Sequence, residues 1–152
     1  MPDKIKIVLA SDHVGVDLRR AVAAHVAARG FAVEDLGPET TERTDYPLWG
    51  EKAARRVQAG EARFGIVICG TGFGISLAAN KLRGIRCVTC SEPYTALLSR
   101  QHNDANMLAF GARVVGQDLA LMIVDAFLDG VHEGGRHGRR VAMIADIEAR
   151  EG

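Results

Sequence analysis

A chain of 152 residues has room for one folded domain, because a chain of this length buries roughly two-thirds of its unfolded surface in a single core. Hydrophobic residues make up 47% of it, and 19 lysines and arginines balance 19 aspartates and glutamates. This balance excludes a net field that would attract nucleic acid or an anionic membrane, so any anion site must be local.

The number of cysteines and the length of the apolar runs indicate in which cellular compartment the protein works. No stretch approaches the roughly 20 apolar residues that cross a bilayer, and residues 1–10 lack the features of a secretion signal. Three cysteines, Cys69, Cys87 and Cys90, are too few and too oddly numbered for a disulfide framework. We therefore expect a cytoplasmic protein with free thiols.

Short apolar runs rich in Val and Ile alternate with longer amphipathic segments along the whole chain. The runs predict five strands, at residues 5–10, 32–36, 64–69, 86–90 and 107–111. Each run is almost continuously apolar, which is typical of a strand buried on both faces of a parallel sheet covered by helices.

The segments between these runs have helical spacing together with helical start and stop signals. They predict helices over residues 16–29, from Pro47, from near Ile75, from Pro93, over 117–129 and over 136–150. Asp45 and Ser91 are expected to cap the helices that have a proline in their first turn. The pattern predicts one domain over residues 1–152: a Rossmann-like three-layer α/β/α sandwich with a five-stranded parallel sheet and an extra C-terminal helix.

Ligands of open parallel sheets bind beyond the carboxyl ends of the strands. Residues 11–13 follow the first strand, Cys69 to Gly74 follow the third, and the fifth leads to Arg113. These three segments should converge on one edge of the sheet.

The segment Cys69 to Gly74 carries three glycines, Gly70, Gly72 and Gly74, between a strand and a helix. Such a loop lets backbone N–H groups point into one space and cradle an anion. A tight structural turn, or a loose relative of the dinucleotide fingerprint, is the alternative interpretation. The glycines follow the third strand rather than the first, and a cysteine occupies the strand tip, which favours a catalytic loop.

Cys69 by itself could be a small core residue. Its position beside an N–H cradle and a helix N-terminus favours the thiolate form, which can act as a base or a nucleophile. Cys87 and Cys90 have the spacing of a redox or metal pair, but residues i and i+3 of a strand point to opposite faces. We expect these two cysteines to pack in the core.

Two further groups of polar residues are candidates for substrate contacts. Arg136 and Arg140, with His137 and Arg139, open the last helix and could grip a phosphate, joined by His13 and Arg113. A solvated helix face is the alternative. His102, within residues 99–106, could exchange protons with a sugar oxygen, or the segment could be a helix C-cap.

Asp12 and Asp45 could accept hydrogen bonds from sugar hydroxyls, and Asp45 could also cap its helix. No set of carboxylates and histidines with credible metal-ligand spacing is evident, so no metal site is expected.

Several ordered segments resemble the ribose-5-phosphate isomerase B family of sugar-phosphate isomerases. They are residues 11–15, 42–47, 69–75, 78–81, 100–104 and 133–137. The match runs through nearly the whole chain. It implies conversion of ribose 5-phosphate to ribulose 5-phosphate through an enediolate, without a metal or an organic cofactor.

The resemblance also implies residue roles. Cys69 would remove the C2 proton, Thr71 would assist proton transfer to the neighbouring oxygen, and His102 would open the furanose ring. The N–H groups from Gly70 through Gly72 and Phe73 to Gly74 would hold the developing oxyanion. Phosphate would bind to His13, Arg113, Arg136, His137 and Arg140. Hydroxyl groups would be positioned by Asp12, Asp45, Tyr46 and Asn103.

One branch of this family has an acidic base at the position of Ile75 and lacks the cysteine, so the chain resembles the cysteine type. The family's dimers and tetramers imply a homodimer or homotetramer in which the basic C-terminal segment reaches a neighbour's active site.

Three alternatives stay open. The same chemistry could act on allose 6-phosphate, galactose 6-phosphate or a tetrulose phosphate, with pocket length set around Tyr46, Phe73 and Arg113. The chain could also be a non-catalytic nucleotide- or phosphate-binding module. A thiol-redox protein built on Cys69 is disfavoured because no resolving cysteine has a plausible position.

Overall fold

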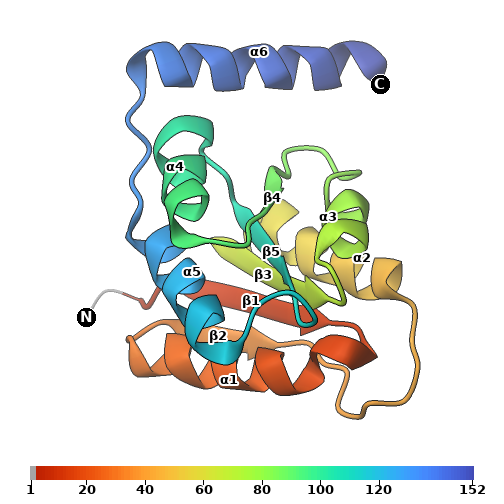
Figure 1. Ribbon diagram of the computed structural model, residues 1–152. Helices are drawn as coiled ribbons and strands as arrows, with labels where there is room; N and C mark the ends of the chain where they lie inside the picture. The colour runs from red at the N-terminus through yellow and green to blue at the C-terminus, as the bar shows by residue number, and fades with distance from the viewer. Residues whose placement is uncertain (1–2) are drawn as a thin grey trace.

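The computed structural model describes residues 3–152, and it has the three layers that the sequence predicts (Figure 1). All five strands are parallel and form one sheet in the order β2-β1-β3-β5-β4. They are β1 Lys6–Ser11, β2 Ala32–Asp35, β3 Phe64–Cys69, β4 Cys87–Thr89 and β5 Met107–Gly111. The chain reverses its direction of travel across the sheet between β1 and β3, which creates a crevice at that point.

Helices cover both faces of the sheet. Their bounds are η1 His13–Gly15, α1 Val16–Ala28, α2 Tyr46–Gln58, α3 Phe73–Ala79, α4 Pro93–Asn103, α5 Gln117–Asp129 and α6 Gly135–Glu151. One core cluster joins β-strand side chains to α1, α4 and α5, and a second joins them to α2 and α3. The central strands β1, β3 and β5 are therefore buried on both faces, which explains their continuous apolar runs, whereas the edge strand β2 is only partly buried.

Helix α6 lies apart from the sandwich, along the top of Figure 1, and its main contact is with α4. Three of its apolar side chains, Met143, Ile144 and Ile147, are at least half exposed. An apolar face of this kind is typical of a helix that packs against another protein surface. None of the helices within residues 3–152 is long and apolar enough to cross a membrane.

Three expected helix starts need correction. The α4 cap is Glu92 rather than Ser91, because α4 begins at Pro93 and the carboxylate of the preceding Glu92 accepts the backbone N–H of Thr95. Asp45 stands at the N-cap position of α2, but its side chain makes no capping hydrogen bond within residues 3–152. Helix α3 begins at Phe73, two residues before Ile75, because the turn at Gly72 leads directly into it.

The prediction for Cys87 and Cys90 is confirmed. Cys87 belongs to the core cluster on one face of the sheet and Cys90 to the cluster on the other. Burial raises the pKa of both thiols, so both stay protonated at neutral pH. They are packing residues with little nucleophilic character.

Close approach of α2 to α3 depends on Gly50. A Cβ at this position would lie 2.7 Å from the carbonyl oxygen of Ile75. We expect Gly50→Ala to lower the free energy of unfolding by about 1–3 kcal/mol, measured by chemical denaturation, because the backbone of α3 cannot move aside. Gly138→Ala in α6 is the matched control, since its Cβ would meet only Nε2 of His132, at 3.7 Å, among the described residues. Equal effects in the two variants would contradict this account.

Candidate active site

The carboxyl ends of β1 and β3 meet at the crevice between these strands. The backbone N–H of Asp12 donates to the carbonyl of Ile68 at 3.1 Å, which holds the two strand ends side by side. The loop after β5 joins them: the N–H of Ala112 donates to the carbonyl of Cys69 at 2.8 Å, and that of Arg113 donates to the carbonyl of Gly70 at 3.1 Å. The three segments expected to converge do converge.

Cys69 is the last residue of β3 and is only 4% exposed. The backbone N–H of Gly72 donates to its Sγ at 3.2 Å. Gly72 has φ +85°, and a Cβ there would lie 2.7 Å from the backbone of Phe110, so only glycine fits. The loop therefore aims an N–H group at the sulfur, which stabilises negative charge on that atom.

Side chains from other elements surround this loop. A Cβ at Gly74 would lie 2.4 Å from the ring of Tyr46, so this ring from α2 packs directly against the loop. A Cβ at Gly70 would lie 3.7 Å from Nη1 of Arg113, which places that guanidinium beside the start of the loop. The exposed hydroxyl oxygen of Thr71 accepts the N–H of Phe73 at 3.3 Å.

His13 and Asp12 follow β1 on the same edge. Nδ1 of His13 lies 3.2 Å from both the carbonyl oxygen and the amide nitrogen of Thr44, which ties the segment carrying Asp45 to the end of β1. The buried carboxylate of Asp12 accepts the N–H groups of Val14 and Gly15. Asp12 thus caps the short helix η1, whereas the side chain of Asp45 is exposed.

The remaining predicted site residues form a second group, far from Cys69 in the same chain. Helix α4 follows β4 and ends just before β5, so His102 and Asn103 lie toward the amino ends of the strands. The register pairs Cys69 with Gly111, four residues beyond Met107, which corresponds to about 13 Å along the strand. Arg136, His137 and Arg140 lie at the start of α6, next to this end of α4.

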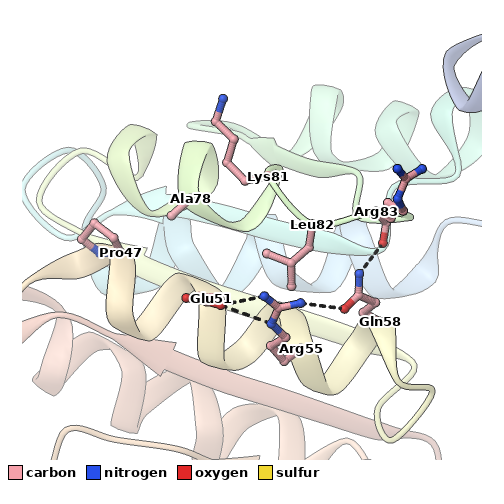
Figure 2. A pocket seen from close by; sticks show the side chains of 8 residues that line it. All are labelled: Pro47, Glu51, Arg55, Gln58, Ala78, Lys81, Leu82 and Arg83. Carbon is pink, nitrogen blue, oxygen red and sulfur yellow. Dashed lines mark hydrogen bonds and ion pairs between the residues drawn. The ribbon is translucent and has the colours of Figure 1, made fainter. Parts of the chain in front are cut away.

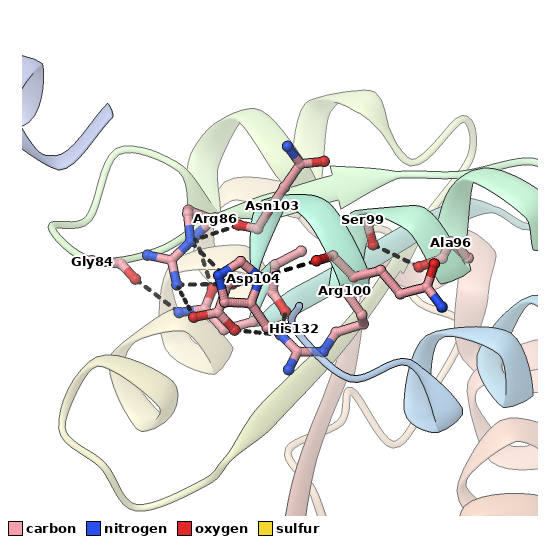
Figure 3. Close-up of polar contacts among 11 residues, drawn as sticks. Gly84, Arg86, Ala96, Ser99, Arg100, Asn103, Asp104 and His132 are labelled. Atoms are coloured by element: carbon pink, nitrogen blue, oxygen red, sulfur yellow. Dashed lines mark hydrogen bonds and ion pairs between the residues drawn. The ribbon is translucent and has the colours of Figure 1, made fainter. Parts of the chain in front are cut away.

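Hydrogen bonds fix the end of α4 (Figure 3). Asp104 adopts a left-handed conformation with φ +47°, and its carboxylate accepts Nη1 of Arg100 at 2.9 Å. Arg86 donates to the carbonyl oxygen of Asp104 from Nε and Nη2, at 3.0 and 2.8 Å. The carbonyl oxygen of Gln101 accepts the N–H of Glu133 at 2.9 Å, which ties the α5–α6 loop to α4.

His102 and His137 stack in parallel, with ring centroids 4.1 Å apart. Glu133 accompanies them, because its Oε1 lies 3.7 Å from Nε2 of His102 and 3.5 Å from Nε2 of His137. Sequence reasoning missed this carboxylate-histidine cluster. The i, i+4 spacing of Glu133 and His137 was a usable signal, but His102 joins them only through the packing of α6 on α4.

Burial, the neighbouring imidazole of His102 and the positive charge of Arg136 lower the pKa of His137, with Glu133 acting in the opposite direction. The neutral imidazole is therefore the dominant form of His137 at neutral pH.

A cavity of about 560 Å³ forms a groove between α2 and the end of α3 (Figure 2). Beside this groove, the guanidinium of Arg55 donates hydrogen bonds to the side chains of Glu51 and Gln58. None of the predicted site residues is among the described residues that line it. The groove is separate from the loop at Cys69.

Comparisons with known proteins show the family of this chain. Residues 7–144 match the family model for Ribose/Galactose Isomerase. The chain is 57% identical to ribose-5-phosphate isomerase B of Escherichia coli K12 over 145 residues, which cover 95% of this chain and 97% of that protein.

Solved structures of related proteins have the same fold. Ribose-5-phosphate isomerase B of Clostridium thermocellum has a TM-score of 0.96 and 51% identity, covering 97% of this chain and all of that one. The Mycoplasma genitalium enzyme with bound ribulose-5-phosphate has a TM-score of 0.92 and 38% identity, covering 97% of this chain and 99% of the other. The chain is therefore a member of the ribose/galactose isomerase family.

Proposed function

We propose that this protein is an aldose-ketose isomerase that interconverts ribose 5-phosphate and ribulose 5-phosphate. The observation that carries the proposal is the sulfur of Cys69, which receives an N–H group from a glycine loop at a sheet crevice. The identity to the E. coli enzyme supports the substrate assignment, as does the ribulose-5-phosphate bound to the M. genitalium relative.

The proposed chemistry is a proton transfer between neighbouring carbons. The Cys69 thiolate takes the proton from C2, and the electrons of that C–H bond form the C1–C2 double bond of an enediolate. Negative charge gathers on O1, where the N–H groups of residues 70–74 stabilise it. Cys69 then returns the proton to C1, while Thr71 assists transfer of the O2 hydroxyl proton to O1.

Other residues would bind and prepare the sugar. His102 would protonate the ring oxygen and open the furanose, and Asn103, Asp45, Tyr46 and Asp12 would hold hydroxyl groups. Because the carboxylate of Asp12 already accepts two backbone N–H groups, its remaining lone pairs would serve the sugar. The phosphate would bind between His13 and Arg113 on one side and Arg136, His137 and Arg140 on the other.

A homodimer with a shared active site would unite these groups. His102 and the α6 arginines lie at the opposite end of the strands from Cys69 in one chain, so a second copy would have to supply them. The exposed apolar side chains of α6 support such an association. Two dimers could also pair into a tetramer.

Two further features belong to this proposal. The reaction needs no metal ion, since Cys69 supplies the base and the loop supplies the positive end of the N–H dipoles. The protein works in the cytoplasm, because a catalytic thiolate must remain reduced and all three cysteines are free.

The test is an NMR assay of ribose 5-phosphate in heavy water with a chelator present. We expect ribulose 5-phosphate to form with deuterium at C1, because a proton held by a cysteine exchanges with solvent. A ketose formed without deuterium would indicate a hydride shift. Activity abolished by the chelator would contradict the metal-free mechanism.

The same assay on four-carbon and six-carbon sugar phosphates tests the substrate. A higher kcat/KM for one of these would transfer the proposal to that sugar. Absence of turnover with all of these sugars would contradict the proposed isomerase activity. The alternative, a non-catalytic phosphate-binding module, would then stand.

A further inference from the structure

The packing of α6 on α4 brings two imidazoles and a carboxylate to one point. Nε2 of His102, Nε2 of His137 and Oε1 of Glu133 are the converging atoms, and all lie within 4.8 Å of one another. These are ligand types that Zn²⁺ accepts in a mixed nitrogen and oxygen site.

The two separations that involve Glu133 fit a tetrahedral ion. Bonds of about 2.1 Å give a distance of about 3.4 Å between neighbouring ligand atoms. The carboxylate oxygen of Glu133 lies 3.7 Å from His102 and 3.5 Å from His137. Because an imidazole lone pair lies in the plane of its ring, the two stacked rings must tilt toward each other to share an ion. The proposal assigns this tilt to His102, whose side chain is 35% exposed.

His137 supplies an independent sign of a ligand. Its side chain is nine-tenths buried, yet Nε2 has no hydrogen-bond partner among residues 3–152. A buried nitrogen without a partner is destabilising.

We propose that His102, Glu133 and His137 form a reversible Zn²⁺ site that inhibits the protein. The bound ion occupies Nε2 of His102 and ties α6 to α4 through His137. The fourth position holds water. The charges of Arg136 and Arg140 oppose binding, so the site is weaker than a structural zinc site. The inhibition rests on the proposed isomerase function, whereas the binding does not.

Zn²⁺ binding is measured first, without any assay of turnover. The full-length protein competes with a chromophoric chelator for Zn²⁺, and thermal unfolding is followed with and without the metal. We expect one ion per chain and a higher Tm, with binding at least about tenfold weaker in Glu133→Gln. Glu133 is half exposed, so this variant should fold. Glu151→Gln, on the exposed surface of α6, is the matched control and should bind like the wild type.

Cobalt separates this site from the thiol of Cys69. Co²⁺ bound to nitrogen and oxygen ligands shows weak d–d bands, and a thiolate ligand adds an intense charge-transfer band. We expect the first spectrum alone. A thiolate band, unchanged affinity in Glu133→Gln, or no Zn²⁺ bound at micromolar free metal would overturn the site.

Inhibition is then measured at the same free Zn²⁺ concentrations. The wild type should lose turnover in parallel with occupancy, and Glu133→Gln should need at least about tenfold more metal. Metal bound at the site with turnover undiminished would overturn the inhibition. A protein that binds Zn²⁺ but isomerises no sugar phosphate without metal would contradict the proposed function and leave the metal site standing.

Discussion

Cys69→Ala should lower kcat for ribose 5-phosphate by about 10³-fold or more, the largest effect expected of any single substitution. The variant keeps the N–H groups of the loop but has no group that can take the C2 proton. Incorporation of deuterium at C1 should fall by the same factor, because exchange and isomerisation share the base. Both quantities come from one NMR time course in heavy water.

Cys90→Ala is the control for this substitution. Cys90 is also 4% exposed and also a free thiol, but it lies in the core cluster on the other face of the sheet. We expect it to keep turnover near the wild-type level. Tm values for both variants separate catalysis from folding. If the turnover of Cys69→Ala is within tenfold of that of the wild type, Cys69 is not the base.

A dimer made of one Cys69→Ala chain and one His102→Ala chain should recover about half of the wild-type activity. In a shared site, one of the two pockets of this mixed dimer receives an intact Cys69 from one chain and an intact His102 from the other. The second pocket carries both substitutions. Each pure variant dimer has only defective pockets and should lose at least about 10²-fold.

Co-expression with two different tags isolates the mixed dimer, and the two pure dimers from the same cells serve as controls. A mixed dimer no more active than the pure dimers would show that each pocket takes both residues from one chain. That result would contradict the shared site.

The central architecture could be predicted from the sequence because its signals are local. Continuous apolar runs identified β1, β3 and β5, whose residues are almost all buried. Shorter apolar runs identified the edge strands β2 and β4, which are only partly buried. The helix caps were less predictable. Ser91 and Glu92 are both able to accept a backbone N–H, and only the path of the chain before Pro93 decides that Glu92 does so.

The loop at Cys69 could also be predicted, because its glycines and strand-tip cysteine are contiguous. The cluster of His102, Glu133 and His137 could not, because it depends on where α6 packs. The separation of His102 from Cys69 follows from the direction of α4. That direction is fixed by the parallel pairing of β4 and β5. Strand pairing depends on contacts between distant parts of the chain, so local sequence patterns do not reveal it.

Two backbone hydrogen bonds, from Ala112 and Arg113 to Cys69 and Gly70, hold the loop after β5 against the glycine loop. In the proposed site, the backbone at Cys69 and the backbone at Arg113 therefore keep a fixed separation, whatever the length of the sugar. A relative that accepts six carbons would have to gain its extra length elsewhere. Among the proposed phosphate ligands, the arginines of α6 are the ones whose position could differ most between relatives, because this helix has few contacts to its own domain.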